Sequence, residues 1–488
     1  MDTISERAGR AGGASANRNL ARAGLLTASV YLATVLFYAR GFQGYTRAAR
    51  EVFIWLAVLP LLYLFWRGYQ LVRDAGDAVK VSTVVALAGL FCVLCVFVYP
   101  FHSTDVFGYI NRGWQQVHYH MNPYVHTVAE VPGWRADPMI WEHWIYNPNP
   151  YGFLFTLLAR GLTFLGGGDW LATLLLFKLL NASAYAFTGR LVWSGAKHLG
   201  HPRPVLALYS FLWNPLVLMH HLANGHNDIL VGCLLALAVY AVVRGRELWV
   251  LPALAAAAML KYAPALLVPA ALVYVFKKRG WKTAVLGCAL AAAVVVACSA
   301  PYLADWREFR LEDIRENATL IDNSLHSFLI HVFENVARLV RPLAPLHGAV
   351  DAAIRLSLRG GFAVFLLFVY VRFLRGVTGE RLVELTTLVM VVLMLVATSK
   401  FNGWYMGMLL PPALFLPERH WLRRLTLLVT CAQTLSLTFF KQAYMLNYFA
   451  MVIVPAFLVY RQVRAERSSA AYEEGTVAET GAVPSAAD

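Results

Sequence analysis

About fourteen apolar stretches constrain this chain more than any other feature, because a helix needs about 20 predominantly apolar residues to cross a membrane. The hydrophobic fraction of 59% and the mean hydropathy of +0.55 exceed what a soluble core requires. We therefore predict an all-α membrane protein, a polytopic bundle of about 14 transmembrane helices. The stretches are residues 25–39, 52–66, 81–100, 170–193, 205–221, 229–243, 249–260, 263–276, 284–300, 361–370, 382–398, 404–416, 422–439 and 444–460.

The distribution of Lys and Arg predicts the orientation of the bundle. Cytoplasmic connections are enriched in these residues, and placing the N-terminus inside puts most of the basic turns there. Two long loops, residues 101–150 and 302–360, then lie outside. We expect a disordered cytoplasmic tail at residues 1–24, a transmembrane domain at 25–461 and a second disordered cytoplasmic tail at 462–488.

The net charge of +14 needs no nucleic-acid partner, because basic turns facing anionic membrane lipids account for most of it. All six cysteines lie within apolar stretches, where packing explains them better than redox chemistry. The chain contains no Walker A motif and no GxGxxG segment after a strand. Direct use of ATP or of a soluble nucleotide sugar is therefore not expected.

The first long loop has an early carboxylate, Asp105, within the sequence HSTDVFGY at residues 102–109. Residues 105 to about 117 suit a helix lying on the membrane surface, which Asn122 and Pro123 then stop. This helix would hold Asp105 at the bilayer surface, facing a cavity. The alternative is that Asp105 only caps the helix, as Asp often does at a helix start.

A second polar cluster lies at the outer end of another predicted helix. The sequence WNPL at residues 213–216 is followed by His220, His221 and then GHND at 225–228. Polar groups clustered at the membrane are functional candidates, because their desolvation is costly. The alternative is a polar turn in which Asn227 or Asp228 caps the helix at 229–243.

Lys261 interrupts two short apolar helices where the chain should turn back, and it is the leading candidate for binding a phosphate. Its alternative role is snorkelling to water. Arg112 and Lys400 are weaker candidates for phosphate or sugar contacts. A required metal is not expected: His118 and His120 alternate in the first loop, but no DxD pair surrounds Asp105.

Several of these motifs together resemble a known family. TDVFGYINRG at 104–113, NPY at 122–124, NPYG at 149–152, WNPL and GHND are similar to motifs of the C-type (GT-C) integral-membrane glycosyltransferases. The nearest resemblance is to bacterial polyprenol-phosphate-mannose-dependent alpha-mannosyltransferases, from about residue 81 to 460. Family members often have Tyr-Gly-Pro where this chain has Tyr151-Gly152-Phe153.

The resemblance implies a GT-C fold in the bacterial cytoplasmic membrane, with the active site facing outside. The expected reaction transfers a hexose, mannose foremost, from a polyprenyl-phosphate donor to a glycan or lipid acceptor with inversion and without a cofactor. Asp105 would be the general base, since a phosphate leaving group needs no acid. The candidate substrate-binding residues are His102, Tyr109, Asn122, Tyr124, Tyr151, His226, Asn227, Asp228, Trp404 and Tyr405.

Two other functions remain open on the residues alone. A transporter or flippase of lipid-linked saccharides would also need polar groups in the membrane, but it commonly has internal repeats, and none is clear here. An oligosaccharide polymerase or ligase would differ from the proposed enzyme only in its donor.

Overall fold

The computed structural model describes residues 2–39, 45–310, 320–438 and 444–480. Helices make up most of these residues, and the described ranges contain no β-strand, only a single bridge between Asp322 and Lys400. The predicted structural class, an all-α membrane protein, is therefore confirmed.

The helices of the first half lie before, within and after the first long loop along the chain. They are α1 (Asp2–Tyr38), α2 (Arg47–Ala75), α3 (Val81–Phe97), α4 (Asp105–Val117), α5 (Phe153–Gly166), α6 (Trp170–His198), α7 (Pro204–Leu212), the π-helix η5 (Val217–Ala223), α8 (Asp228–Val243), α9 (Val250–Leu260), η7 (Ala263–Leu267) and α10 (Val268–Arg279).

The second half continues the bundle. Its helices are α11 (Trp281–Ser299), η8 (Ala300–Glu308), α13 (Leu325–Leu339), η9 (Arg341–Leu346), α14 (His347–Leu374), α15 (Gly379–Val392), η10 (Leu393–Ala397), η11 (Gly403–Tyr405), α16 (Met406–Ala413), α17 (Trp421–Gln433), η12 (Thr434–Leu437), α18 (Tyr444–Tyr448), η14 (Phe449–Ile453) and α19 (Val454–Thr480).

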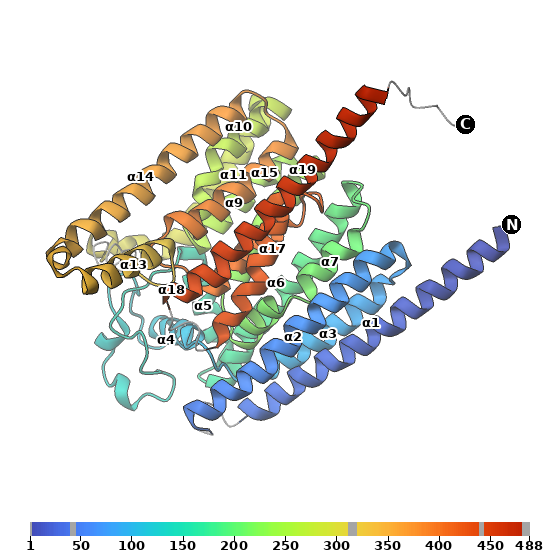
Figure 1. Ribbon diagram of the computed structural model, residues 1–488. Coiled ribbons are helices and arrows are strands. Elements are labelled where there is room, and N and C mark those ends of the chain that lie inside the picture. Colours follow the sequence, from blue (N-terminus) through green and yellow to red (C-terminus); the bar gives the residue numbers. More distant parts are fainter. Residues whose placement is uncertain (1, 40–44, 311–319, 439–443, 481–488) are drawn as a thin grey trace.

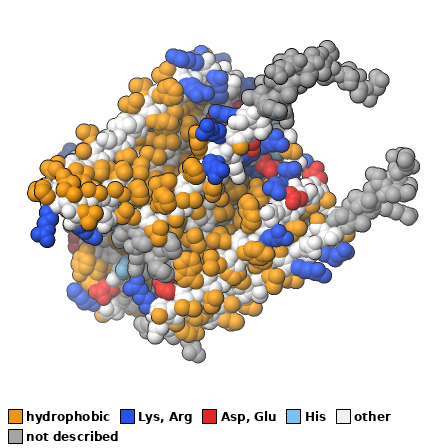
Figure 2. Space-filling model, in the orientation of Figure 1, with side chains coloured by type: hydrophobic (Ala, Val, Ile, Leu, Met, Phe, Trp, Pro, Cys, Tyr) orange, Lys and Arg blue, Asp and Glu red, His pale blue; other side chains and the backbone are white. Residues whose placement is uncertain are grey.

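The long helices run beside one another, and the two ends of the chain lie at the same end of the bundle (Figure 1). The short helix α4 and the loop that follows it lie at the opposite end, near α13 and α18. Apolar side chains cover a broad band across the helices, with Lys and Arg mainly towards its two ends (Figure 2). This distribution fits a bundle whose flank faces lipid.

In the described part of the chain, six helices are long and apolar enough to cross a membrane, or seven if the pair α7 and η5, bent by 50°, forms one span. The prediction of about 14 spans is not confirmed. Several predicted stretches form short helices instead, such as α8 with 16 residues and α9 with 11. A buried helix inside a large bundle can be apolar on all sides without spanning the membrane.

Three predicted segment ends differ from the helix bounds in the structure. α1 begins at Asp2 and α19 continues to Thr480, whereas disorder was predicted for residues 1–24 and from 462 onwards. Both segments are rich in Ala, together with Arg in the first and Glu in the second, and these residues favour helix. α14 begins at His347, inside the loop predicted at 302–360. Some residues of the predicted segments lie outside the described ranges, namely 1, 311–319, 439 and 481–488.

Two local predictions that matter for the site are confirmed. The helix expected from Asp105 to about Val117 is α4. The chain also breaks at Lys261, between α9 and η7. The apolar segment after residue 152 forms α5, which packs against α4.

Candidate active site

Asp105 is the first residue of α4, and the connection from α3 that carries it is held from two sides. The side-chain oxygen of Asn224 accepts hydrogen bonds from the backbone N–H groups of Phe101 and His102, at 2.9 and 2.8 Å. Lys178 of α6, almost fully buried, donates to the backbone carbonyls of Val96 and Val98 at the end of α3. Asp105 is therefore positioned by distant parts of the chain.

The capping role considered for Asp105 does not describe its position. Thr104 occupies the N-cap of α4 without a side-chain capping bond, and Asp105 follows inside the helix. A carboxylate in the first turn is favoured by the positive end of the helix dipole, yet the side chain keeps 21% of its surface exposed. It is thus accessible to a substrate.

The turn with His226 and Asp228 lies directly against the start of α4. Gly225 has a positive φ of 79°, and a Cβ at this position would come within 3.0 Å of Val106. Only glycine combines this backbone conformation with so close an approach. The side-chain amide of Asn181 donates to the carbonyls of His221 and His226 and fixes the turn. A π-helix, η5, leads into it, and such helices are frequent at functional sites.

Asp105 and His226 face each other. Nδ1 of His226 lies 3.4 Å from Oδ2 of Asp105, and the His226 side chain is fully buried. Burial works to raise the pKa of Asp105, but His226, the hydroxyl of Ser103 and the charge of Lys261 outweigh it and hold the pKa below its usual range. Asp105 is therefore an ionised carboxylate at neutral pH.

Lys261 forms an ion pair with Asp228 across the same site. Its Nζ donates to Oδ1 of Asp228 at 2.6 Å and lies 5.0 Å from the centre of the Tyr405 ring. The Asp228 side chain is 1% exposed and that of Lys261 is 22% exposed. Lys261 has three N–H donors, so its remaining donors can bind an anion. The snorkelling interpretation is weaker than this paired arrangement.

Three tyrosines surround the two carboxylates. Burial is the largest cause that raises the pKa of Tyr109, Tyr151 and Tyr405, and the charges of Asp105 and Asp228 raise it further in each case. All three are therefore neutral phenols that can donate hydrogen bonds. They supply uncharged donors next to the carboxylates.

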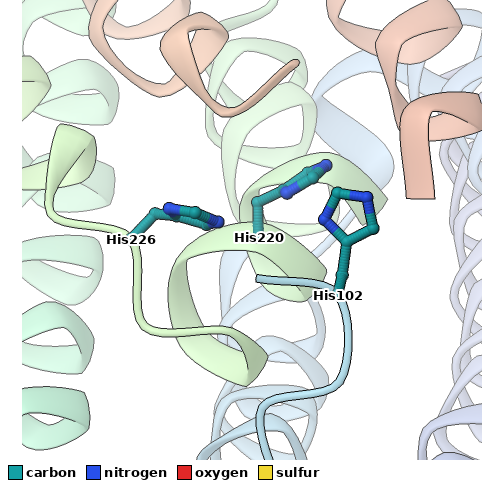
Figure 3. A group of neighbouring side chains, drawn as sticks. All are labelled: His102, His220 and His226. Atoms are coloured by element: carbon teal, nitrogen blue, oxygen red, sulfur yellow. The ribbon is translucent and has the colours of Figure 1, made fainter. Parts of the chain in front are cut away.

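Trp404 and two further histidines complete the group. The ring of Trp404 stacks on His226 with 4.0 Å between centroids and 12° between planes. His102 and His220 lie next to them, with 5.3 Å between their ring centroids. Figure 3 shows the ring of His226 pointing toward His220, with His102 beside it. His102, His226 and Trp404, predicted from the sequence as substrate-binding residues, thus lie in one group, in which His226 faces Asp105; their role in substrate binding stays a prediction.

Arg112 is placed for a structural role rather than for binding phosphate. Its Nη1 donates to the carbonyl of Gly108 at 3.1 Å, and its Nη2 approaches the carbonyls of Trp144, Asn147 and Pro148 at 3.1 to 3.4 Å. The residue is only 5% exposed. Its guanidinium therefore ties the loop back onto α4.

Asn122 and Tyr124 also bind protein groups. Asn122 donates to the Tyr302 carbonyl and to Asp305, so it joins the first loop to the start of the second. The Tyr124 hydroxyl, in a side chain 2% exposed, contacts the Tyr151 carbonyl at 2.9 Å. These contacts support the loop and do not place either side chain against Asp105.

Lys400 lies beside Trp144 of the first long loop. Its Nζ is 5.6 Å from the centre of the Trp144 ring, and that ring lies against Gly108 in the first turn of α4. Among the described side chains, the Oδ1 of Asn227 and the Oδ2 of Asp228 are buried and accept no hydrogen bond. Neither acceptor is paired within the described part of the protein.

Sequence reasoning missed several residues that position the site. Asn224 adjoins the GHND motif, so its position in the chain could have marked it, and His220 was noted only as part of the second cluster. Asn181, Lys178 and Ser436 lie in apolar segments far from either motif. The available signal was the presence of polar residues within these otherwise apolar segments.

The site combines an accessible ionised carboxylate, a paired lysine, neutral phenols and a stacked indole. A general base and a cation for a leaving phosphate suit transfer of a group onto a hydroxyl. Aromatic faces and hydrogen-bond donors suit a sugar ligand. The arrangement therefore fits glycosyl transfer.

Comparisons with known proteins agree with this arrangement. Alpha-(1->6)-mannopyranosyltransferase A of Mycobacterium tuberculosis is 29% identical over 211 residues, covering 42% of this chain and 39% of the relative. The protein of the same name from Corynebacterium glutamicum is 26% identical over 199 residues, covering 40% of this chain and 39% of the relative. The matched part thus spans about two fifths of either relative. Residues 10–277, more than half of the chain, match the family described as alpha-(1->6)-mannopyranosyltransferase, N-terminal domain, so the chain belongs to that family.

Proposed function

We propose that this protein transfers a mannosyl residue from a polyprenyl-phosphate donor to a glycan or lipid acceptor outside the bacterial cytoplasmic membrane. The observation that carries the proposal is an accessible, ionised Asp105 in the same site as Lys261, which pairs with Asp228 and whose charge reaches Asp105. The family membership supports mannose as the sugar. The placement of α4 at the end of the bundle opposite both termini supports a site on the outer face.

In the proposed reaction, Asp105 accepts the proton of the acceptor hydroxyl. The hydroxyl oxygen bonds to the anomeric carbon while the bond from that carbon to the phosphate oxygen breaks, so the configuration inverts. The lipid phosphate leaves as an anion next to Lys261 and needs no proton. One carboxylate therefore suffices, whereas glycosidases use two.

Binding of the donor would strengthen the base. The phosphate is negative, so near Lys261 it offsets the charge that lowers the pKa of Asp105. A higher pKa makes a carboxylate a better proton acceptor. Tyr109, Tyr151, Asn227 and Trp404 are positioned to hold the sugar, and Lys400 is a more distant partner for the phosphate.

The test is transfer of radiolabelled mannose from synthetic polyprenyl phosphate mannose by the purified full chain, with determination of the anomeric configuration of the product. We expect Asp105→Asn to lower the rate about 10² to 10⁴-fold, the usual contribution of a general base. Glu142→Gln is the matched control, because Glu142 is an exposed carboxylate of the same loop.

Three results would refute the proposal in different ways. Equal transfer by Asp105→Asn would remove Asp105 as the base, provided that thermal unfolding shows both proteins folded. A retained anomeric configuration would refute the single-displacement chemistry. Absence of transfer by the wild-type chain, with folding intact, would contradict the donor and favour a transporter or a ligase.

A further inference from the structure

We propose that His102, His220 and His226 bind a divalent transition-metal ion of the zinc type beside Asp105. One ligand atom from each ring lies within 4.8 Å of those of the other two. The three side chains converge from separate segments, namely the connection between α3 and α4, the π-helix η5 and the turn before α8 (Figure 3). The sequence suggested His118 and His120 as the pair to consider, and both are exposed and outside this group.

The neighbours of two of these rings select the tautomers that metal ligation requires. Nε2 of His102 lies 2.8 Å from the backbone carbonyl oxygen of Ser436, so this nitrogen carries the proton and Nδ1 is the ligand atom. Nδ1 of His226 faces the carboxylate of Asp105 at 3.4 Å, which assigns Nε2 as its ligand atom. Metal-ligating histidines characteristically donate their other N–H to a carbonyl or a carboxylate.

The third ring shares a neighbour with the first. Nε2 of His220 lies 3.3 Å from Oγ of Ser436, the residue whose carbonyl orients His102. The stacking of Trp404 on His226 holds the remaining ring in place. All three imidazoles are therefore oriented by outer partners, which is the arrangement that fixes ligand direction in metal sites.

The spacing requires only small movements. Zinc binds histidine nitrogen at about 2.0 to 2.1 Å, so two nitrogens of a tetrahedral site lie roughly 3.4 Å apart. The ligand nitrogens of two rings that lie at most 4.8 Å apart reach a separation of roughly 3.4 Å when each ring moves about 0.7 Å toward the other. Three protein ligands also leave one position open, as in catalytic rather than structural zinc sites.

The surrounding charge favours a cation. Asp105 and Asp228 carry two negative charges near the histidines, and Lys261 neutralises one of them. Oδ2 of Asp228 is buried and accepts no hydrogen bond from the described residues. Three imidazoles suit zinc, cobalt, nickel or copper, whereas magnesium and calcium prefer oxygen ligands. The open position would hold a substrate oxygen beside Asp105.

Metal binding can be measured without any assay of transfer. The full chain, purified in detergent through a tag without histidine, is stripped with a chelator and titrated with Zn²⁺ and Co²⁺. We expect one ion per chain by elemental analysis after desalting. Electron paramagnetic resonance of the Cu²⁺-loaded protein should show coupling to three imidazole nitrogens.

Two variants and one matched control locate the site. His102→Gln and His226→Gln should each lower the affinity at least tenfold, the range for loss of a ligand or its supporting contact. The double variant His118→Gln/His120→Gln also removes two loop histidines and should bind as the wild type does. Thermal unfolding of the stripped proteins shows whether each variant folds.

The proposal is overturned if the wild-type chain binds less than one ion per chain, or if electron paramagnetic resonance of the Cu²⁺-loaded protein shows oxygen ligands only. Unchanged affinity in a folded His102→Gln variant would overturn it as well. Loss of binding in the His118→Gln/His120→Gln control would move the site to the exposed loop. Because the wild-type spectrum counts the nitrogens directly, the test stands even if a variant does not fold.

Discussion

Two charged residues of α4, one at its start and one near its middle, lie in opposite situations. At its start, Asp105 is 21% exposed, and its carboxylate faces the ring of His226 at 3.4 Å. Two turns later, Arg112 is buried, and its guanidinium contacts four backbone carbonyls. The carboxylate of Asp105 can therefore still contact a ligand, whereas the guanidinium of Arg112 bonds to groups of the protein itself.

Whether the protein itself supplies the hydrogen-bond partners therefore distinguishes structural residues from ligand-binding residues better than residue type does. A buried polar group must be hydrogen-bonded or it destabilises the fold. Where the protein itself supplies the partners, as for Arg112 and Tyr124, the group supports structure. Where acceptors remain open, as at Asn227 and Asp228, a ligand is the natural partner.

The largest expected effect tests the structural role of Arg112. Arg112→Met leaves the four carbonyls without their donor, and we expect the free energy of unfolding to fall by about 3 to 5 kcal/mol. Thermal unfolding followed by intrinsic fluorescence measures this loss, with Arg112→Lys as the control that keeps the charge. An unchanged unfolding temperature together with lost donor binding would instead place Arg112 in the substrate site.

The second-largest expected effect tests the ion pair between Lys261 and Asp228. Lys261→Met leaves Asp228 as a buried, unpaired carboxylate, which costs about 3 kcal/mol of stability. The double variant Lys261→Met/Asp228→Asn should recover most of this stability, yet it should still bind donor phosphate weakly. Thermal unfolding and donor titration separate the two quantities. Recovery of donor binding in the double variant would show that Lys261 does not contact the phosphate.

A smaller effect is expected at the stacked indole. Trp404→Leu keeps an apolar side chain but removes the ring that stacks on His226, and aromatic stacking contributes about 0.5 to 1.5 kcal/mol beyond burial. We expect roughly a tenfold loss in kcat/KM for transfer. Trp404→Phe should recover part of the rate, and equal losses in both variants would argue against stacking.

The smallest effect concerns pH. The pKa of Asp105 is lower in the folded protein than the value of about 3.9 for an exposed Asp. Its stabilising contribution is therefore complete above about pH 4 and is lost only as the pH falls through the lower folded value. Between pH 5 and 8, kcat/KM should show no acid limb due to Asp105. A limb in this range that moves in Ser103→Ala would contradict the lowered pKa.

Local patterns in the sequence predicted α4 and the break at Lys261, because helix ends depend on nearby residues such as the polar segment before Asp105. Composition likewise predicted the all-α membrane class. Helix number was not predictable in the same way, since buried helices such as α8 are as apolar as those that face lipid.

The sequence by itself therefore determined the helical class and identified Asp105, His226 and Lys261 as candidates, because charged or titratable groups in apolar surroundings are costly and stand out. Only the tertiary structure showed that Arg112 supports the loop and that Ser436 lies beside His102. These hydrogen-bond partners come from segments 35 to 334 residues apart, and only the packing of the helices decides which of them meet.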